Sequence, residues 1–149
     1  MKLRFLLIVL LAIFLFSCDS TDPQDYAKAR IDQILTDIEI NFNSNNLVEL
    51  MKNYHTNYRQ YDEGYYLDYN DISERWESRL ANQALVEIND RDIELQGDFW
   101  AKVNCTLIFI SDEGTIEYIE PSSENGDISY FYKNSAGEWK ICGKDFISY

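Results

Sequence analysis

The stretch that decides the fold is ISYFYKNSAGEWKICGKDF, residues 128–146. Apolar and aromatic side chains recur on both sides of the tetrapeptide Asn-Ser-Ala-Gly at 134–137, which has the composition of a tight turn. The pattern therefore predicts two antiparallel strands, at 128–133 and 139–147. Strands joined by so short a turn are neighbours in a sheet, and such a sheet commonly has one covered face.

The residues upstream of this hairpin keep the two-residue period of a strand. Apolar side chains occupy every second position from Phe99 to Phe109, which predicts one long strand. Another strand begins at Leu85, but the parity of its apolar residues changes near Asp90, which predicts a bulge or bend there. A short strand at 116–119 is ended by Pro121. These strands form an antiparallel meander.

Before the strands the period is helical. A long helix over 23–43 is predicted by apolar residues at Ala27, Ile31, Ile34, Leu35, Ile38 and Phe42. A short second helix lies within 45–54. The sequence from Asp71 to Glu74 matches a capping box and predicts the start of a third helix. Residues 55–70 are predicted to form a loop or a short hairpin. Helices followed by an antiparallel meander indicate an α+β fold.

In this order of elements, the chain resembles the nuclear transport factor 2-like (NTF2-like) superfamily, whose cone fold is shared with ketosteroid isomerases and SnoaL-like proteins. The matching stretches are NNLVELMKNY at 45–54, ISERWESRL at 72–80 and GEWKI at 137–141. The resemblance covers residues 24–147. It implies N-terminal helices packed on a curved antiparallel sheet, and dimerisation through the open sheet face. The family includes enzymes, transport adaptors and ligand-binding modules, so it does not select an activity.

The N-terminus has the features of an export signal. Lys2 and Arg4 precede twelve apolar residues, a run that is shorter than the roughly 20 residues of a membrane span. The run ends in Leu-Phe-Ser-Cys, which resembles the lipobox of bacterial lipoproteins. That resemblance implies cleavage before Cys18 and attachment of fatty-acyl chains such as palmitate to it. The alternative is an uncleaved anchor in which Cys18 is idle.

The predicted organisation is therefore a signal peptide at 1–17, a lipidated cysteine with a short tether at 18–22, and one domain at 23–149. The predicted location is the bacterial cell envelope, lipid-anchored and facing the periplasm or the exterior. The sequence does not decide between the inner and the outer membrane. With 13 basic and 26 acidic residues the net charge is −13, which argues against a nucleic-acid partner.

Six tyrosines within residues 54–70 are the strongest local bias in the chain. Rigid rings that carry a hydroxyl suit the binding of sugars, aromatic compounds or a partner protein. They suit equally a loop that packs over the mouth of the cone. The candidate ligand-binding residues are Tyr54, Tyr58, Tyr61, Trp76 and Cys105.

His55 is the sole histidine and a weak catalytic candidate, because some enzymes of the resembled family use a histidine with an aspartate in the cone. A lone histidine at a helix end is more often a surface or capping residue. Cys105 is expected to be a buried small hydrophobe and Cys142 a free thiol, since the strand at 128–133 separates them in the family's strand order. The sequence predicts no metal site and no cofactor.

The leading hypothesis is a membrane-anchored, extracytoplasmic binding or interaction module rather than an enzyme. Its ligand would be a small apolar or aromatic molecule or a protein partner. One alternative is a small cone-fold enzyme of isomerase or dehydratase type, and another is an accessory subunit of an envelope complex. A pocket carboxyl with a raised pKa would favour the enzyme. A cone filled by its own side chains would favour the accessory subunit.

Overall fold

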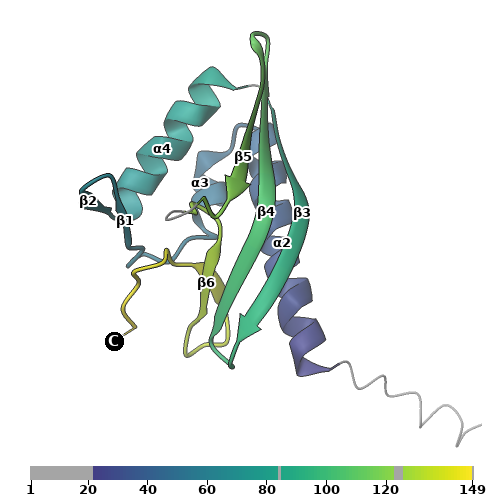
Figure 1. Cartoon of the computed structure of the whole chain (residues 1–149), viewed down its shortest axis with the longest axis vertical. Coiled ribbons are helices and arrows are strands. Elements are labelled where there is room, and N and C mark those ends of the chain that lie inside the picture. The colour runs from purple at the N-terminus through teal and green to yellow at the C-terminus, as the bar shows by residue number, and fades with distance from the viewer. Residues whose placement is uncertain (1–21, 84, 123–125, 149) are drawn as a thin grey trace, which may run out of the picture.

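A computed structural model describes residues 22–83, 85–122 and 126–148 of the protein (Figure 1). Cys18, the signal peptide and the tether up to residue 21 lie outside the described residues. Within the described residues, no helix has the length and apolar character needed to cross a membrane. In chain order the helices and strands are α2 (Pro23–Asn43), α3 (Leu47–Met51), β1 (Gln60–Asp62), β2 (Tyr65–Leu67), α4 (Tyr69–Asn82), β3 (Leu85–Gln96), β4 (Trp100–Ser111), β5 (Gly114–Glu120), β6 (Tyr130–Lys133) and β7 (Trp139–Ile141).

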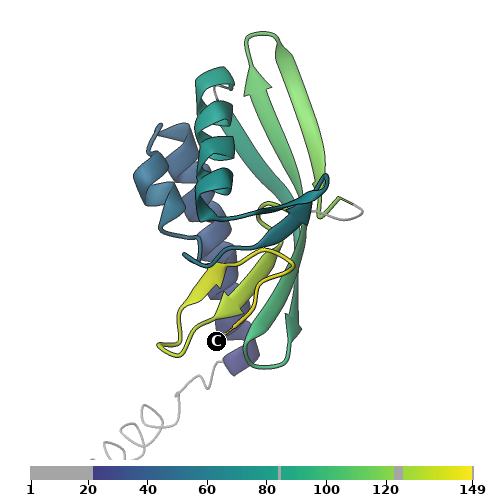
Figure 2. The ribbon, with the colours of Figure 1, turned by 90° about the vertical axis from the view of Figure 1, so that its left-hand side faces the viewer.

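The main sheet is antiparallel and has the order β3-β4-β6-β7. Strands β5 and β6 pair with the same edge of β4: β6 pairs with its first half and β5 with its second half. The helices lie on one side of this curved sheet (Figure 2). Strands β1 and β2 form a separate hairpin beside α4. The predicted α+β architecture, with N-terminal helices on a curved antiparallel sheet, is confirmed.

Helix α2 begins and packs as its sequence predicts. The Asp22 side chain accepts a hydrogen bond from the Gln24 amide (2.9 Å), and Pro23 takes the first helical position, where a missing amide costs nothing. All six apolar residues that predicted the helix are buried. The apolar stripe therefore supplies most of the packing between this helix and the sheet.

The parity change near Asp90 is a β-bulge. The β3–β4 register shifts between Asn89 and Asp92, and Asp90 has a φ of 53°, in the left-handed region. The bulge turns Arg91 toward α2, where its guanidinium bonds the carboxylates of Asp32 (3.1 Å) and Glu39 (2.8 Å). A local irregularity of the strand thus becomes a point of attachment for the long helix.

Some predicted boundaries are wrong. Strand β5 begins at Gly114 and β6 at Tyr130, each two residues from the predicted start, and the start of α4 and the end of β7 differ more. Helix α4 begins at Tyr69. The capping box is formed by Asp68 as the N-cap and Asp71 as the third helical residue, and not by Asp71 and Glu74 as predicted. The earlier start lets the Tyr69 hydroxyl reach the Met51 carbonyl oxygen (3.3 Å). Strand β7 ends at Ile141 rather than at 147. The Cys142 amide still donates to Tyr130 of β6, but the Cys142 carbonyl oxygen and the Asp145 amide bond to the backbone of Arg59.

The two cysteines of the domain are both buried and free. Cys105 lies in β4 and Cys142 follows β7, and β6 lies between those strands, as predicted. Burial raises the pKa of the Cys105 thiol to about 12, so this thiol stays protonated and behaves as a small apolar group.

Candidate functional site

The tyrosine-rich segment divides its rings between the core and the surface. Tyr54 and Tyr58 are 3% and 2% exposed, whereas Tyr61, Tyr65 and Tyr66 on the β1–β2 hairpin are each about half exposed. Tyr61 and Tyr66 pack edge to face, with ring centroids 5.3 Å apart. The structure thus brings together only part of the predicted ligand-binding set.

Tyr54 and Trp76 are core residues that share a hydrogen-bonded chain. The Trp76 indole donates to the Tyr54 hydroxyl (2.7 Å), which donates to the Asp127 carbonyl oxygen (3.0 Å). Trp76 is fully buried and packs edge to face on Phe42 (5.8 Å). At this level the interior is filled by rings, so these two residues stabilise the cone and do not offer their surfaces to a ligand.

Four charged residues form an ion-pair cluster between α4, the hairpin and the start of β6: Asp62, Arg75, Arg79 and Asp127. Asp127 is 3% exposed, and its two carboxylate oxygens accept from Arg75 (2.9 Å) and Arg79 (2.7 Å). Arg75 also donates to Asp62 (2.7 Å). The two positive and two negative charges balance, and the cluster ties α4 to the sheet.

Sequence reasoning missed this cluster because Asp127 lies in a predicted loop. The available signal was the spacing of Arg75 and Arg79. Residues four apart share one face of a helix, and here that face is turned toward the sheet. Two arginines on the apolar side of a helix imply a buried acidic partner elsewhere in the chain.

Glu120 is a buried carboxyl on the inner face of the sheet. It lies opposite Cys105 in the β4–β5 register, and the Ser129 hydroxyl donates to its side chain (3.2 Å). Burial first, and the nearby charge of Asp127 second, raise the pKa of Glu120 to about 8. Glu120 therefore carries a proton at neutral pH and has the acidity of a general acid.

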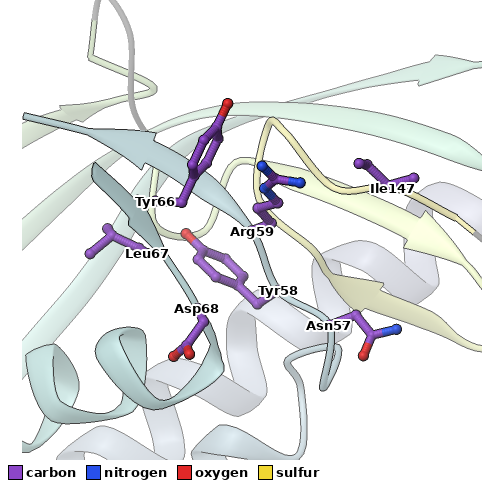
Figure 3. A pocket seen from close by; sticks show the side chains of 7 residues that line it. All are labelled: Asn57, Tyr58, Arg59, Tyr66, Leu67, Asp68 and Ile147. Atoms are coloured by element: carbon purple, nitrogen blue, oxygen red, sulfur yellow. The ribbon is translucent and has the colours of Figure 1, made fainter. Parts of the chain in front are cut away.

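A groove opens next to this interior, under the β1–β2 hairpin (Figure 3). We call it the hairpin groove; its volume is about 360 Å³. Its lining residues are Asn57, Tyr58, Arg59, Tyr66, Leu67, Asp68 and Ile147. The Arg59 guanidinium lies 3.9 Å from the centroid of the Tyr66 ring, so a cation and an aromatic face lie together at one side.

Tyr58 connects the hairpin groove with the interior. Its ring lines the groove, and its buried hydroxyl has no hydrogen-bond partner among the described residues. Burial and the charge of Asp127 raise the pKa of Tyr58 well above that of a free phenol, so the hydroxyl remains protonated. The hydroxyl can donate a hydrogen bond to a ligand. Such a bond is favourable because a buried hydroxyl without a partner has lost its hydrogen bonds to water.

His55 lies at the end of the sheet rather than in the ion-pair cluster. Its ring packs edge to face on Phe146 (4.6 Å), and its Nδ1 accepts from the Asn57 amide (3.0 Å). Burial, followed by the charge of Lys140, lowers the pKa of His55. These contacts are those of a residue that shapes a turn. The catalytic role suggested for His55 stays a prediction.

The described residues contain no group of three metal-ligating side chains placed to hold an ion. No protein-family model matches the chain, and no curated protein matches it. Solved structures do match, over most of the chain.

One similar structure is an NTF2-like protein of unknown function from Shewanella oneidensis, with 13% identity and a TM-score of 0.63 over 78% of this chain and 95% of that one. Another is a protein proposed to be a dehydratase of the NTF2-like family from Streptomyces avermitilis, with 14% identity and a TM-score of 0.58 over 80% and 94%. A third is a ketosteroid isomerase-like protein from Erwinia carotovora, with 12% identity and a TM-score of 0.52 over 77% and 90%. These likenesses show that the chain has the NTF2-like cone fold.

Proposed function

From the NTF2-like cone fold as a premise, we propose that this protein is a lipid-anchored binding domain of the bacterial cell envelope. Its lipid is carried by Cys18, and its ligand is a small molecule held in the hairpin groove. The observation that carries the binding proposal is the groove itself, a space of about 360 Å³ lined by two tyrosine rings and by a guanidinium that lies against one of them.

The lining of the groove indicates the chemistry of the ligand. Tyr66 and Ile147 are each about half exposed and offer aromatic and apolar contact, while the buried Tyr58 ring forms part of the wall, which favours a ligand with a flat apolar face. The positive charge of Arg59 lies near the negative charge of Asp68, whose carboxylate caps α4, so a ligand without net charge is favoured over a strongly charged one. The proposed ligand is therefore of the small apolar or aromatic kind, with polar groups at its rim.

A small cone-fold enzyme is the second candidate, and Glu120 favours it. A buried carboxyl with a pKa of about 8, close to two buried tyrosines, has the protonation state that general acid catalysis requires at neutral pH. Some proteins of similar structure are named for dehydratase or isomerase activity. Glu120 is not among the residues that line the hairpin groove, however, so binding is the function that the geometry supports better.

Replacing Cys18 by alanine is expected to move the protein from the membrane fraction to the soluble fraction, because the acyl chains are the proposed anchor. Fractionation and immunoblotting of cells that express the full chain measure this. Cys105→Ala is the matched control, since that thiol is buried in β4 and cannot be acylated in the folded domain. A Cys18→Ala protein that remains wholly in the membrane fraction contradicts the anchoring proposal.

The hairpin groove is tested by two neighbouring tyrosines of equal exposure. Tyr66 lines the groove and Tyr65 does not. A small-molecule extract of the source cells is added to the ¹⁵N-labelled domain, and chemical shifts are recorded. We expect shifts at Asn57, Arg59 and Asp68 in the wild type and in Tyr65→Ala, and their loss in Tyr66→Ala. Equal shifts in both variants place the ligand elsewhere.

A further inference from the structure

The free edge of β5 is a surface that takes no part in the hairpin groove. Within the described residues β5 pairs with β4 alone, and six of its seven residues are exposed. The β4–β5 hairpin extends past the end of α4 (Figures 1 and 2). The outward N–H and C=O groups of such an edge are available to another strand.

This edge carries large apolar side chains on both faces. Ile116 and Tyr118 lie on the inner face, opposite Phe109 and Leu107, and are 45% and 48% exposed. Ile119 lies on the outer face and is 72% exposed. An added strand would cover apolar surface on both sides, which favours its binding beyond the backbone hydrogen bonds.

Two of the features that commonly protect a sheet edge are missing from β5, namely a β-bulge and a lysine or proline within the strand. The β4–β5 register is unbroken from Cys105 to Ser111, so no bulge twists the edge away. The strand sequence GTIEYIE contains neither lysine nor proline. The charged residue at its centre is Glu117, which is exposed on the outer face beside Ile119.

Glu117 also argues against a second copy of this chain as the added strand. Antiparallel pairing of two complete β5 strands over 114–120 would place residue 117 opposite itself. Two carboxylates in directly opposed positions destabilise a strand pair, and each chain carries a net charge of −13. A strand with a basic residue opposite Glu117 forms a pair of opposite charges, which stabilises the strand pair.

We propose that the free edge of β5 binds an extended segment of a partner protein as an added strand. The segment has apolar side chains on the face that meets Ile116 and Tyr118, and a lysine or arginine opposite Glu117. This inference concerns a different surface from the hairpin groove and stands independently of the small-molecule proposal.

The probe for this site is a fluorescein-labelled heptapeptide, acetyl-VTVKVTV-amide, whose binding is followed by fluorescence anisotropy. Its valines fall on one face and its central lysine falls opposite Glu117 in either strand direction. Three comparisons define the site. A peptide with glutamate at the centre tests the charge pair, and the lysine peptide with alternate backbone nitrogens methylated tests the hydrogen-bonded ladder. The protein variants Glu117→Lys and Glu113→Lys test the position on the protein. Both variants change the net charge equally, but Glu113 lies in the turn before β5.

The wild type is expected to bind the lysine peptide at least about fivefold more tightly than the glutamate peptide. Glu117→Lys should reverse this preference, whereas Glu113→Lys should keep it. The methylated peptide should not bind, because it cannot extend the hydrogen-bonded ladder. The proposal is overturned if the lysine peptide does not bind, if the methylated peptide binds equally well, or if both protein variants reverse the preference.

Discussion

Replacing Asp127 by alanine should lower the free energy of unfolding by about 3 kcal/mol or more, because it leaves two partly buried guanidinium groups without their carboxylate. Arg75 and Arg79 both donate to this side chain, and their own side chains are 29% and 21% exposed. The Tyr54 hydroxyl bonds the backbone oxygen of Asp127, so the substitution keeps that contact and isolates the carboxylate. Urea unfolding measured by circular dichroism gives the change.

Asp32→Ala is the matched control for this prediction. Asp32 also pairs with an arginine, Arg91, but its side chain is 52% exposed, and such surface pairs contribute about 1 kcal/mol or less. If Asp127→Ala unfolds at the same urea concentration as Asp32→Ala, the ion-pair cluster does not hold α4 to the sheet as described.

Replacing Glu120 by glutamine should make the protein more stable at high pH and remove part of its pH dependence. A carboxyl whose pKa rises from 4.5 in the unfolded chain to about 8 in the folded one binds its proton more tightly when folded. Its contribution is therefore complete below about pH 4.5, falls as the pH rises, and is lost above about pH 8. The loss can reach about 1.4 kcal/mol per pH unit in that window.

The measurement compares urea unfolding of the wild type and Glu120→Gln at pH 5 and pH 8. Glutamine cannot ionise and keeps an oxygen that can accept from the Ser129 hydroxyl, so the variant isolates the titration. The difference in stability between the two proteins should grow by up to about 4 kcal/mol from pH 5 to pH 8. A difference that is constant with pH means that Glu120 does not hold its proton in the folded state.

The elements with a strong periodic signal could be predicted from the sequence. The apolar stripe of α2 and the parity change near Asp90 both correspond to observed structure, because burial of one face fixes helix orientation and strand register. Boundaries were harder. Asp68 and Asp71 each begin an acidic pair at capping-box spacing, and the choice between them depends on tertiary contacts of Tyr69 with α3.

The candidate site was only partly predictable, because it joins segments far apart in the chain. Tyr58 was expected to bind a ligand, but Ile147 comes from the C-terminal tail and has no sequence signal that places it beside the hairpin. Glu120 did have a signal. It shares the parity of Ile116 and Tyr118, so the alternation already placed it on the inner face of β5.

The central claim is that the mature protein is anchored through Cys18 and carries a small ligand in its hairpin groove. Native mass spectrometry of the full protein, purified from its source membranes in mild detergent, tests both parts at once. The account predicts a chain that begins at Cys18 with covalent acyl groups, together with a non-covalent small molecule that is retained by Tyr65→Ala and absent from Tyr66→Ala. An unprocessed chain without acyl groups would contradict it. So would the absence of a bound ligand from the wild type and from both variants.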